Sequence, residues 1–390
     1  MSEQPRSRRQ TRAAILGQLL QSGGMFRPPL AKAVRLSEAS LSRILFDLKA
    51  EGLVEEIRRP VPYFGGPSAL VSLDRSVALG AIEIAGQWLS VGIGALSGEL
   101  QETKRLALPE HPTVQSVGRV FHEALTVLRD WTRRRHVKLV QIGISVPGLG
   151  RLSVSGNAII PCDIARIRAM LSEMFRDVPA EFTNSVVAHA TFHRCRMEGY
   201  PFSGAHLFVF VGQGVAGAWM DDTIATDGAQ VVELGHMVFG DGGPLCRCGH
   251  HGCVEAYASL PALAALLGVP EPDLHELRND WVTTVPLSSQ VRQELRLRLF
   301  RLGLAIGNTL NVKPSRAIAI SGWPSLLPPE DRTSLLQGID SSLLGGLDAA
   351  ALAVAFVPPS TGHDPRAALA FAACCLASRG GMPAEATEAA

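Results

Sequence analysis

Three cysteines lie within eight consecutive residues of this chain, at Cys246, Cys248 and Cys253, and glycines separate them. His236 precedes the first of them, which gives the spacing His-x9-Cys-x-Cys-x4-Cys. Three thiolates and one imidazole complete the tetrahedral set of a structural zinc site, and glycines let the backbone fold tightly around the ion. The spacing therefore predicts Zn²⁺ as a structural cofactor bound by these four residues. Because a closed set leaves no open coordination position, we do not expect this ion to activate water.

Two further histidines of the same loop, His250 and His251, are competing ligands that we rank below His236. The chain has seven cysteines, an odd number, and its Arg-rich segment Met1–Arg12 lacks the apolar run and cleavage site of a secretory signal. No apolar stretch reaches the roughly 18 residues of a membrane span. These features predict a cytoplasmic protein with no membrane partner, in which clustered cysteines indicate a metal more often than a disulfide. The other cysteines are expected to be buried apolar side chains: Cys162, Cys195, Cys374 and Cys375.

Charge is distributed unevenly along the 390 residues. Residues 1–60 contain eleven Lys and Arg against six Asp and Glu, a balance of +5, whereas the other 330 residues contain 26 against 30, a balance of −4. A basic N-terminal segment on a mildly acidic body predicts a small anion-binding module joined to something else. At roughly 100–200 residues per domain, the length predicts two or three structural units.

The first 73 residues carry the pattern of a winged helix-turn-helix. The expected elements are helices over Thr11–Gln21, Pro28–Val34 and from a cap at Ser37 to Gly52, then strands over Leu53–Ile57 and Ala69–Leu73 around a wing loop at Arg58–Gly66. The buried stripe of the third helix is expected to be Leu41, Ile44, Leu45 and Leu48. Its solvent face is expected to carry Glu38, Ala39, Ser40, Ser42 and Arg43.

Short polar side chains and an arginine on that face suit a helix that lies in the major groove of double-stranded DNA. Surrounding basic residues would contact phosphates, which positions a protein without reading sequence: Arg6, Arg8, Arg9, Arg12, Lys32, Arg35, Arg58 and Arg59. The residues predicted to bind DNA are Ser40, Ser42, Arg43, Arg35, Lys32, Arg58 and Arg59. The alternative is a three-helix packing unit with an ordinary solvated face. Arg35 also departs from the pattern, since many such turns have Gly there.

After Val77 the pattern changes to strands, glycine turns and helices. Two strands at residues 78–84 and 89–94 surround a turn, a third is expected at 100–107, and a nearly continuous apolar run at 139–146 indicates a buried strand that leads into Pro147-Gly148. A second round of helices and strands follows, up to Met220. Two such rounds resemble the duplicated actin-like, hexokinase-like α/β architecture, with a cleft between two lobes.

The cysteine loop resembles the signature of the ROK family, which groups bacterial sugar kinases with sugar-responsive transcription factors. That signature runs Glu-x-Gly-His, then Cys-x-Cys-Gly-x-x-Gly-Cys-x-Glu, and every fixed position is present between Glu233 and Glu255. The resemblance covers nearly the whole chain, in the family's order: residues 8–73, Val146-Pro147-Gly148 and Asn308–Gly322. It implies an N-terminal winged helix-turn-helix followed by a two-lobed, ribonuclease H-like ATPase fold.

The resemblance also implies sugar-binding residues. Glu233, His236 and Glu255 match the family's sugar-contacting positions, and Asn184 matches the Asn of an Asn-Asp pair in which Asn holds sugar hydroxyls and Asp is the general base. Here that pair is Asn184-Ser185, and a serine hydroxyl with an ordinary pKa does not accept the sugar's proton as a carboxylate does. Arg166 or Arg168 could bind an anionic group on the ligand, or could be surface arginines.

The nucleotide-binding positions are altered. The family's first phosphate turn, Asp-x-Gly-Gly-Thr, is Glu83-Ile84-Ala85-Gly86-Gln87, whereas the second loop keeps three glycines in Gly212–Gly217. Ser321-Gly322 stands where Gly-Gly is usual, and Arg366-Ala367-Ala368 where Gly-Ala-Ala is common. Because phosphoryl transfer depends on positioning and charge stabilisation, these changes together predict that the chain is not an enzyme.

We therefore expect a transcriptional regulator, a repressor of carbohydrate metabolism, in which a sugar or sugar derivative binds a catalytically inactive ROK domain. The alternatives are an ATP-dependent sugar kinase with an added DNA-binding domain, and a DNA-binding protein whose body only dimerises. The expected partners are operator DNA and the sugar effector, in a homodimer or dimer of dimers located in the bacterial cytoplasm at the nucleoid. The expected domains are residues 1–73 for DNA binding, 76–380 for sensing, and a disordered tail at 381–390.

Overall fold

The structure is a computed structural model of the chain. It describes residues 7–59, 68–148, 160–196, 200–202, 204–221, 229–240, 242–270, 287–345, 351–359 and 364–381. The chain divides into two units, one formed by residues 1–198, 223–227 and 363–390 and the other by residues 199–222 and 228–362. None of the described helices is long and apolar enough to cross a membrane.

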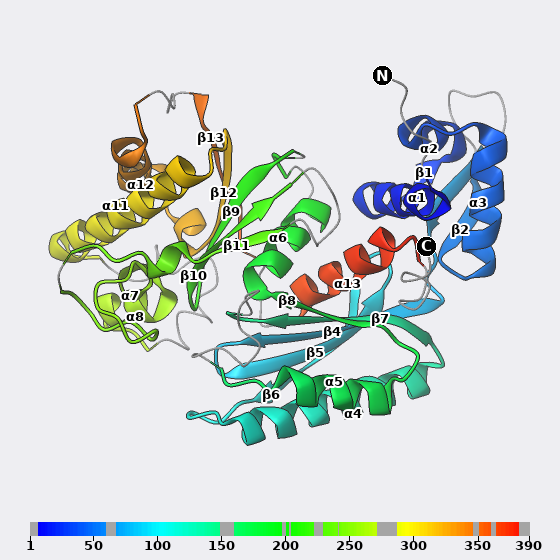
Figure 1. The fold of residues 1–390 in the computed structure, drawn as a ribbon, viewed down its shortest axis with the longest axis horizontal. Helices are drawn as coiled ribbons and strands as arrows, with labels where there is room; N and C mark the ends of the chain where they lie inside the picture. The colour runs from blue at the N-terminus through cyan, green and yellow to red at the C-terminus, as the bar shows by residue number, and fades with distance from the viewer. Residues whose placement is uncertain are drawn as a thin grey trace. The chain divides into compact units, whose positions relative to one another are not determined.

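The first unit begins with three helices and a three-stranded antiparallel sheet (Figure 1). In chain order these are α1 (Arg8–Ser22), β1 (Met25–Phe26), α2 (Arg27–Val34), α3 (Glu38–Ala50), β2 (Val54–Arg59) and β3 (Ser68–Leu73), with the strand order β1-β3-β2. The Ser37 hydroxyl accepts a hydrogen bond from the Ser40 backbone N–H at 3.2 Å, which confirms the predicted cap of α3. The winged helix-turn-helix fold is thus confirmed, with the two-residue strand β1 as an addition. Residues 60–67 of the wing loop lie outside the described residues.

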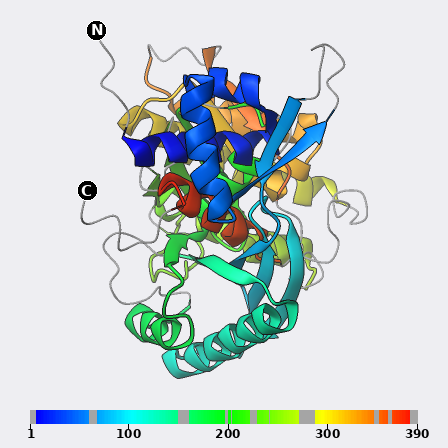
Figure 2. The same cartoon turned by 90° about the vertical axis from the view of Figure 1, so that its right-hand side faces the viewer.

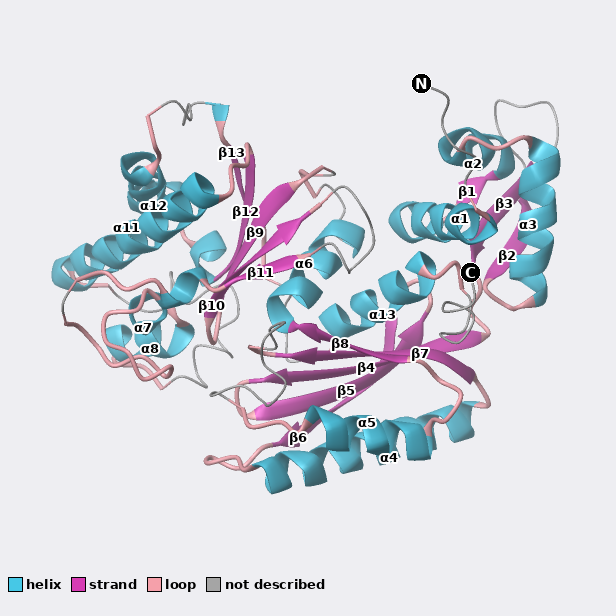
Figure 3. Ribbon diagram, in the orientation of Figure 1, coloured by secondary structure: helices cyan, strands magenta, loops and turns pink. Residues whose placement is uncertain are grey.

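A five-stranded sheet follows in the same unit. Its strands are β4 (Val77–Ala85), β5 (Trp88–Ala95), β6 (Leu100–Ala107), β7 (Lys138–Val146) and β8 (Ala180–Asn184), in the order β6-β5-β4-β7-β8. Strands β4, β7 and β8 run parallel, so their carboxyl ends share one edge. Figure 3 shows α4 (Val114–Arg135) and α5 (Ile164–Met174) on one face of this sheet, and α6 (Ser185–Arg196) and α13 (Arg366–Ser378) on the other.

The second unit repeats this strand pattern. Its sheet contains β9 (His206–Val211), β10 (Val215–Met220), β11 (Gln230–Val232), β12 (Ala317–Gly322) and β13 (Ala353–Phe356), in the order β11-β10-β9-β12-β13. In both sheets an antiparallel three-stranded meander continues into two parallel strands. The duplication expected from the sequence is therefore confirmed. The helices of this unit are η2 (Leu234–His236), α7 (Glu255–Ala258), α8 (Leu260–Leu267), α11 (Ser289–Val312), η3 (Trp323–Leu326) and α12 (Pro329–Ser342).

Helix α13 is buried between the N-terminal helices and the first sheet (Figure 2). Gly143 of β7 permits a close approach, since a Cβ there would lie 2.3 Å from the Ala368 carbonyl oxygen. One apolar core contains Leu16 and Leu53 from the winged helix-turn-helix together with Leu369 and Leu376 from α13. The last helix of the chain therefore completes the core of its first domain. A turn ends at Gly381, and residues 382–390 lie outside the described residues.

Candidate functional site

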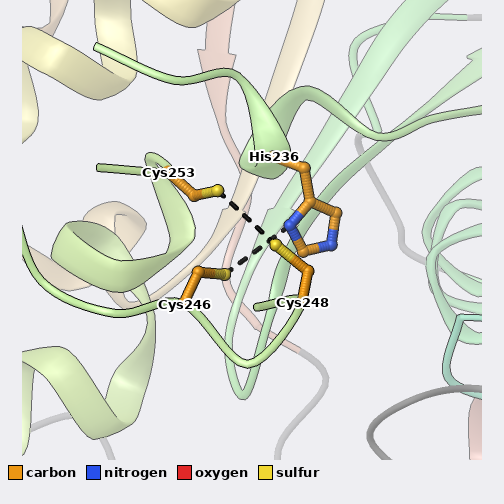
Figure 4. A group of neighbouring side chains, drawn as sticks. All are labelled: His236, Cys246, Cys248 and Cys253. Atoms are coloured by element: carbon orange, nitrogen blue, oxygen red, sulfur yellow. Dashed lines mark hydrogen bonds between the residues drawn. The ribbon is translucent and has the colours of Figure 1, made fainter. Parts of the chain in front are cut away.

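The cysteine loop of the second unit brings four potential metal ligands together (Figure 4). The ligand atoms of His236, Cys246, Cys248 and Cys253 all lie within 4.8 Å of one another. His236 ends the short helix η2, while Cys246 and Cys253 are buried beside it. The Cys246 sulfur lies 3.7 Å from Nδ1 of His236, and the sulfurs of Cys248 and Cys253 are 3.6 Å apart.

These separations fit a tetrahedral ion. With zinc–sulfur bonds of about 2.3 Å, the edge of the tetrahedron is about 3.8 Å long. The set of three thiols and one imidazole can therefore hold a metal ion without a change of fold. The two competing histidines lie differently: Nδ1 of His250 is 3.6 Å from the Cys248 sulfur, and Nδ1 of His251 is 2.9 Å from the Gly243 carbonyl oxygen. Neither belongs to the group of four.

The thiols of this loop differ in acidity. Burial raises the pKa of Cys253 to about 12 and also raises the pKa of Cys246. The backbone N–H of His250 lowers the pKa of Cys248 to about 6, because it stabilises the thiolate. A bound cation would displace the protons of the two less acidic thiols.

Glu255 connects the cysteine loop to the turn between β9 and β10. It is buried, its Oε2 accepts a hydrogen bond from the Val215 backbone N–H at 3.0 Å, and the Cys246 sulfur lies 3.9 Å from its Oε1. The pKa of Glu233 is raised by loss of solvent, an effect that His236 opposes and Glu255 reinforces. Three of the four predicted sugar-binding residues, Glu233, His236 and Glu255, thus gather in the second unit.

The fourth, Asn184, belongs to the first unit, at the end of β8. Its side-chain oxygen accepts a hydrogen bond from the Val186 backbone N–H at 3.0 Å and so begins α6. The next residue, Ser185, is hydrogen-bonded through its hydroxyl to the Ser145 hydroxyl at 3.2 Å. A hydroxyl pair therefore occupies the position at which the family resemblance implies the general base.

Glu83 lies beside this position, where β4 and β7 place it level with Ser145. Burial raises its pKa to about 8, helped by the nearby Asp364 carboxylate and opposed by the Ala368 backbone N–H and by Arg366. Burial lowers the pKa of His189 to about 4, and its Nε2 lies 3.5 Å from the Glu83 carboxylate. At neutral pH both groups are therefore uncharged.

Asp364 and Arg366 flank the start of α13. The Arg366 guanidinium donates to the Asp364 carboxylate at 2.7 and 2.5 Å, and this pair lies near Glu83. The residues of the first phosphate turn and of the altered Gly-Ala-Ala position are thus neighbours. Sequence reasoning placed each change separately and did not predict that they meet.

The winged helix-turn-helix presents only part of the predicted DNA-binding set. Lys32, Arg35 and Arg43 are exposed, and Ser40 and Ser42 are half-buried. The side chains of Arg58 and Arg59 lie outside those the structure describes. The predicted phosphate contact at Arg12 is wrong. Its side chain is 2% exposed and bonded to Glu51 and to the Gly380 carbonyl oxygen, because it closes the contact between α1 and α13.

Other sequence expectations have definite outcomes. The four cysteines outside the loop are buried, as predicted, and the sulfurs of Cys195 and Cys374 are 3.2 Å apart.

The Arg168 guanidinium stacks over the Phe182 ring, 4.7 Å from its centroid. Helix α5 begins at the Asp163 cap, whose carboxylate accepts from the Arg166 backbone N–H.

A winged helix-turn-helix, followed by a duplicated α/β fold that carries a His-Cys₃ loop, defines a class of actin-like α/β proteins with an added N-terminal winged helix-turn-helix. Residues 79–356 match the profile described as the ROK family. The chain belongs to the ROK family.

Solved structures of both regulators and kinases share this fold. A ROK family transcriptional regulator, a homologue of the E. coli MLC protein, covers 96% of this chain and 97% of its own, with a TM-score of 0.71 and 16% identity. A ROK family glucokinase from Streptomyces griseus, solved with glucose and AMPPNP, covers 76% of this chain and 98% of its own, with a TM-score of 0.56 and 18% identity. Both likenesses concern the fold.

Curated relatives include both functional classes. An N-acetylmannosamine kinase from Haemophilus influenzae (strain 86-028NP) is 26% identical over 48% of this chain and 61% of its own length. A protein named "Putative xylose repressor" from Caldicellulosiruptor sp. (strain Rt8B.4) is 24% identical over 65% of this chain and 64% of its own length. The alignments thus span less than two thirds of either relative.

Proposed function

We propose that this protein is a DNA-binding transcriptional repressor of carbohydrate metabolism, and that its ROK domain binds a sugar or sugar derivative without phosphorylating it. The observation that carries the proposal is helix α13. Its first turn lies against Glu83 at the carboxyl edge of the first sheet, and the turn that follows it is bonded through the Gly380 carbonyl oxygen to Arg12 of the winged helix-turn-helix. A ligand that favours one arrangement of this edge would thereby act on the DNA-binding domain, through its differential affinity for two states.

Three features argue against phosphoryl transfer. The Ser185 hydroxyl pairs with the Ser145 hydroxyl where a carboxylate base would be needed. Glu83 is a neutral acid at pH 7, which makes it a poor ligand for a magnesium–phosphate group. Arg366 is already paired with Asp364. Each change weakens the positioning and charge stabilisation on which phosphoryl transfer relies.

The proposed sugar ligands are Asn184, Glu233, His236 and Glu255. Each offers a polar group of the kind that vicinal hydroxyls require, and the last three interact electrostatically. Glu255 gives Oε2 to the Val215 N–H, so its remaining acceptor is Oε1, which accepts from the Cys246 thiol at 3.9 Å and would be released when a metal ion displaces that proton. We propose that the effector hydroxyls bind to this remaining acceptor and to Glu233.

We propose Zn²⁺ as the metal, held by His236, Cys246, Cys248 and Cys253. A thiolate-rich set of this kind favours zinc over magnesium or calcium, which prefer oxygen ligands. Bound zinc would fix the loop between η2 and α7 and so position Glu233 and Glu255. Because four protein ligands close the coordination sphere, the role is structural.

The DNA-binding domain is proposed to span residues 1–73 and the sensor 76–380, acting in the cytoplasm as a homodimer or dimer of dimers on double-stranded operator DNA. Lys32, Arg35, Arg43, Arg58 and Arg59 are proposed DNA contacts, together with Ser40 and Ser42. Two-fold operators mirror two-fold proteins, so the half-site spacing should equal one helical turn or a multiple of it. Light scattering of the free protein and of the DNA complex measures the assembly.

One experiment tests the proposal directly. Fluorescence anisotropy measures binding of the protein to DNA selected from a random pool, alone and with a panel of hexoses, pentoses and their N-acetyl and phosphorylated derivatives. We expect tight binding to a subset of sequences and a shift in affinity with one class of sugar. Absence of sequence preference would overturn the regulator, and no shift with any sugar would favour a body that only dimerises.

A second candidate function is an ATP-dependent sugar kinase. The observation in its favour is the segment Gly212–Gly217, which keeps three glycines: Gly212 and Gly214 lie between β9 and β10, and Gly217 lies in β10. Incubation with ATP, Mg²⁺ and the same sugars separates the two functions. Formation of sugar phosphate over repeated turnovers would establish the kinase. If no sugar phosphate forms, the regulator remains the proposed function.

A further inference from the structure

Helix α3 presents one stripe of side chains to solvent, directly opposite the stripe that it buries. Leu41, Leu45 and Leu48 are its buried residues. At about 100° of rotation per residue, positions 39, 43, 46 and 50 fall on the other side of the helix. The exposed side chains at these positions are Ala39, Arg43, Phe46 and Ala50. We call these four residues the outer stripe.

Phe46 is the unusual member of the outer stripe, because 74% of its side chain is exposed. The polar residues that sequence analysis placed on this face are less available. The Ser40 hydroxyl is bonded to the Ser37 hydroxyl at 3.0 Å, and the Ser42 hydroxyl accepts from Arg27 at 3.2 Å. Apart from its two alanines, the outer stripe therefore consists of a guanidinium and an aromatic ring.

The charges around the outer stripe favour DNA as its partner. Within the part of the chain that the structure describes, Arg43 makes no ion pair or hydrogen bond, and Lys32 of the neighbouring helix is exposed. Of the two carboxylates on α3, Asp47 beside Phe46 is paired with Arg8. The other, Glu38, is exposed in the first turn beside Ala39. A protein partner that covers only an apolar ring would leave these cations unmatched, whereas a DNA groove would match both.

The major groove offers matching chemistry for both side chains. Guanine presents O6 and N7, which accept two hydrogen bonds from an arginine, and thymine presents a methyl group that packs on apolar side chains including Phe. Three residues advance about 4.5 Å along a helix, and successive base pairs are about 3.4 Å apart. A ring at position 46 would therefore lie one or two base pairs from a base bonded to Arg43.

We propose that Arg43 and Phe46 read the operator as a pair, with Arg43 bonded to a guanine and Phe46 packed on the methyl group of a thymine one or two base pairs away. This inference rests on the proposed function, because it requires sequence-specific DNA binding. Phe46 would then determine sequence specificity, although an apolar side chain on an amphipathic helix is normally assigned to the core.

The test replaces thymine by deoxyuridine, which removes only the methyl group. The best sequence selected from a random pool is bound by the full-length protein, with each thymine replaced in turn. We expect one thymine per half-site, near a guanine, whose replacement weakens binding about four-fold, as for one buried methyl-sized group of ~0.8 kcal/mol. In Phe46→Ala the same replacement should have no effect. Leu344→Ala, which truncates a side chain 70% exposed in the second unit, is the matched control.

Each result is decisive. Phe46→Ala should weaken binding to the thymine site without changing the salt dependence, because Phe46 contacts no phosphate. If each deoxyuridine replacement weakens DNA binding by Phe46→Ala as much as it weakens binding by the wild type, the inference is wrong, and the proposed regulator function is unaffected. Phe46→Ala could instead lower the mass of the DNA-free protein in light scattering and leave the deoxyuridine effect as in the wild type. In that case Phe46 joins two copies of the chain, and the inference is also wrong. A wild type that selects no sequence overturns the proposed function and the inference together.

Discussion

The Arg12 guanidinium, in the first helix of the chain, donates to the Gly380 carbonyl oxygen at 2.6 Å, across 368 positions of sequence. The same guanidinium binds both carboxylate oxygens of Glu51, the residue that ends α3. One buried side chain thus connects three helices: α1, α3 and α13. In the proposed regulator, this contact joins α3, the proposed DNA-facing helix, to α13, whose first turn lies against Glu83.

Arg12→Ala should destabilise the first unit. Loss of the guanidinium leaves the Gly380 carbonyl oxygen without its partner and opens the apolar core around it, at a cost of about 1–3 kcal/mol. Arg8 also belongs to α1 and forms an exposed ion pair with Asp47 of α3. Arg8→Ala, which removes that pair, should lower stability by less than ~1 kcal/mol. Urea unfolding followed by circular dichroism measures both. Equal losses in the two variants would contradict a structural role for Arg12.

Glu83 should make stability fall at alkaline pH. Its pKa is raised by burial from 4.5 to about 8, so the stability that it contributes is fully present below pH 4.5 and is lost as pH rises through 8. His189, whose pKa burial lowers from 6.5 to about 4, acts in the opposite direction and only below pH 6.5. Between pH 6.5 and 9 the Cys248 thiol, whose pKa is lowered from 9.0 to about 6, acts in the opposite direction to Glu83, so the Glu83 effect is measured as the difference between the wild type and Glu83→Gln.

We expect the Tm of the wild type to fall by several degrees relative to that of Glu83→Gln from pH 6.5 to 9, at about 2–4 °C per kcal/mol. Scanning fluorimetry across this range measures the difference. Glu99→Gln, which changes an exposed carboxylate, is the control and should follow the wild type. Parallel profiles for all three proteins would show that Glu83 is not neutral in the fold.

Metal removal should identify the ligands of the cysteine loop. The purified protein should contain one zinc per chain by mass spectrometry, and His236→Ala and Cys253→Ser should lose it. His250→Ala should retain it, because His250 lies outside the group of four. Zinc affinity should fall as pH is lowered, since protons compete for the thiolates. Zinc loss in His250→Ala with retention in His236→Ala would reverse the assignment of the imidazole.

Arg35 and His136 are the two residues other than glycine with a positive φ among the described residues, at 56° and 52°. Each ends a helix in the left-handed conformation, which costs roughly 1–2 kcal/mol for a side chain with a Cβ. Because glycine also gains freedom in the unfolded chain, Arg35→Gly and His136→Gly should each raise stability by no more than ~1 kcal/mol.

The two variants should differ in DNA binding. Arg35→Gly removes a proposed phosphate contact, so the slope of log K against log salt should decrease by about 1. His136→Gly, far along the chain at the end of α4, should leave that slope unchanged. An unchanged slope in both variants would remove Arg35 from the DNA interface, whatever its effect on stability.

Most of the fold could be predicted because periodicity and caps are local. Ser37 begins α3, the apolar run at 139–146 becomes the buried strand β7, and the ROK resemblance accounts for the duplicated sheets. The metal ligands were predictable for the same reason, since spacing within one loop limits how far apart they can lie.

Long-range contacts could not be predicted in this way. Arg12 has the sequence context of a phosphate contact, and only the packing of α13 on α1 buries it. The meeting of Glu83 with Asp364 and Arg366 likewise depends on where the last helix lies. Phe46 was missed because apolar residues on an amphipathic helix are normally assigned to the core. Its exposure follows from its position on the side of the helix opposite the buried Leu41 and Leu48.

The core shared by α1 and α13 has a consequence for synthesis. Leu16 and Leu53 are made early, but Leu369 and Leu376, which cover them, leave the ribosome more than 300 residues later, since position 369 lies 316 residues after position 53. Until then α1 packs on its neighbours α2 and β3, the part of its apolar face that α13 covers stays exposed, and Arg12 lacks the Gly380 carbonyl. In the proposed regulator, a nascent or truncated chain would therefore hold an incomplete winged helix-turn-helix, and only a chain with a finished ROK domain would compete for operator DNA.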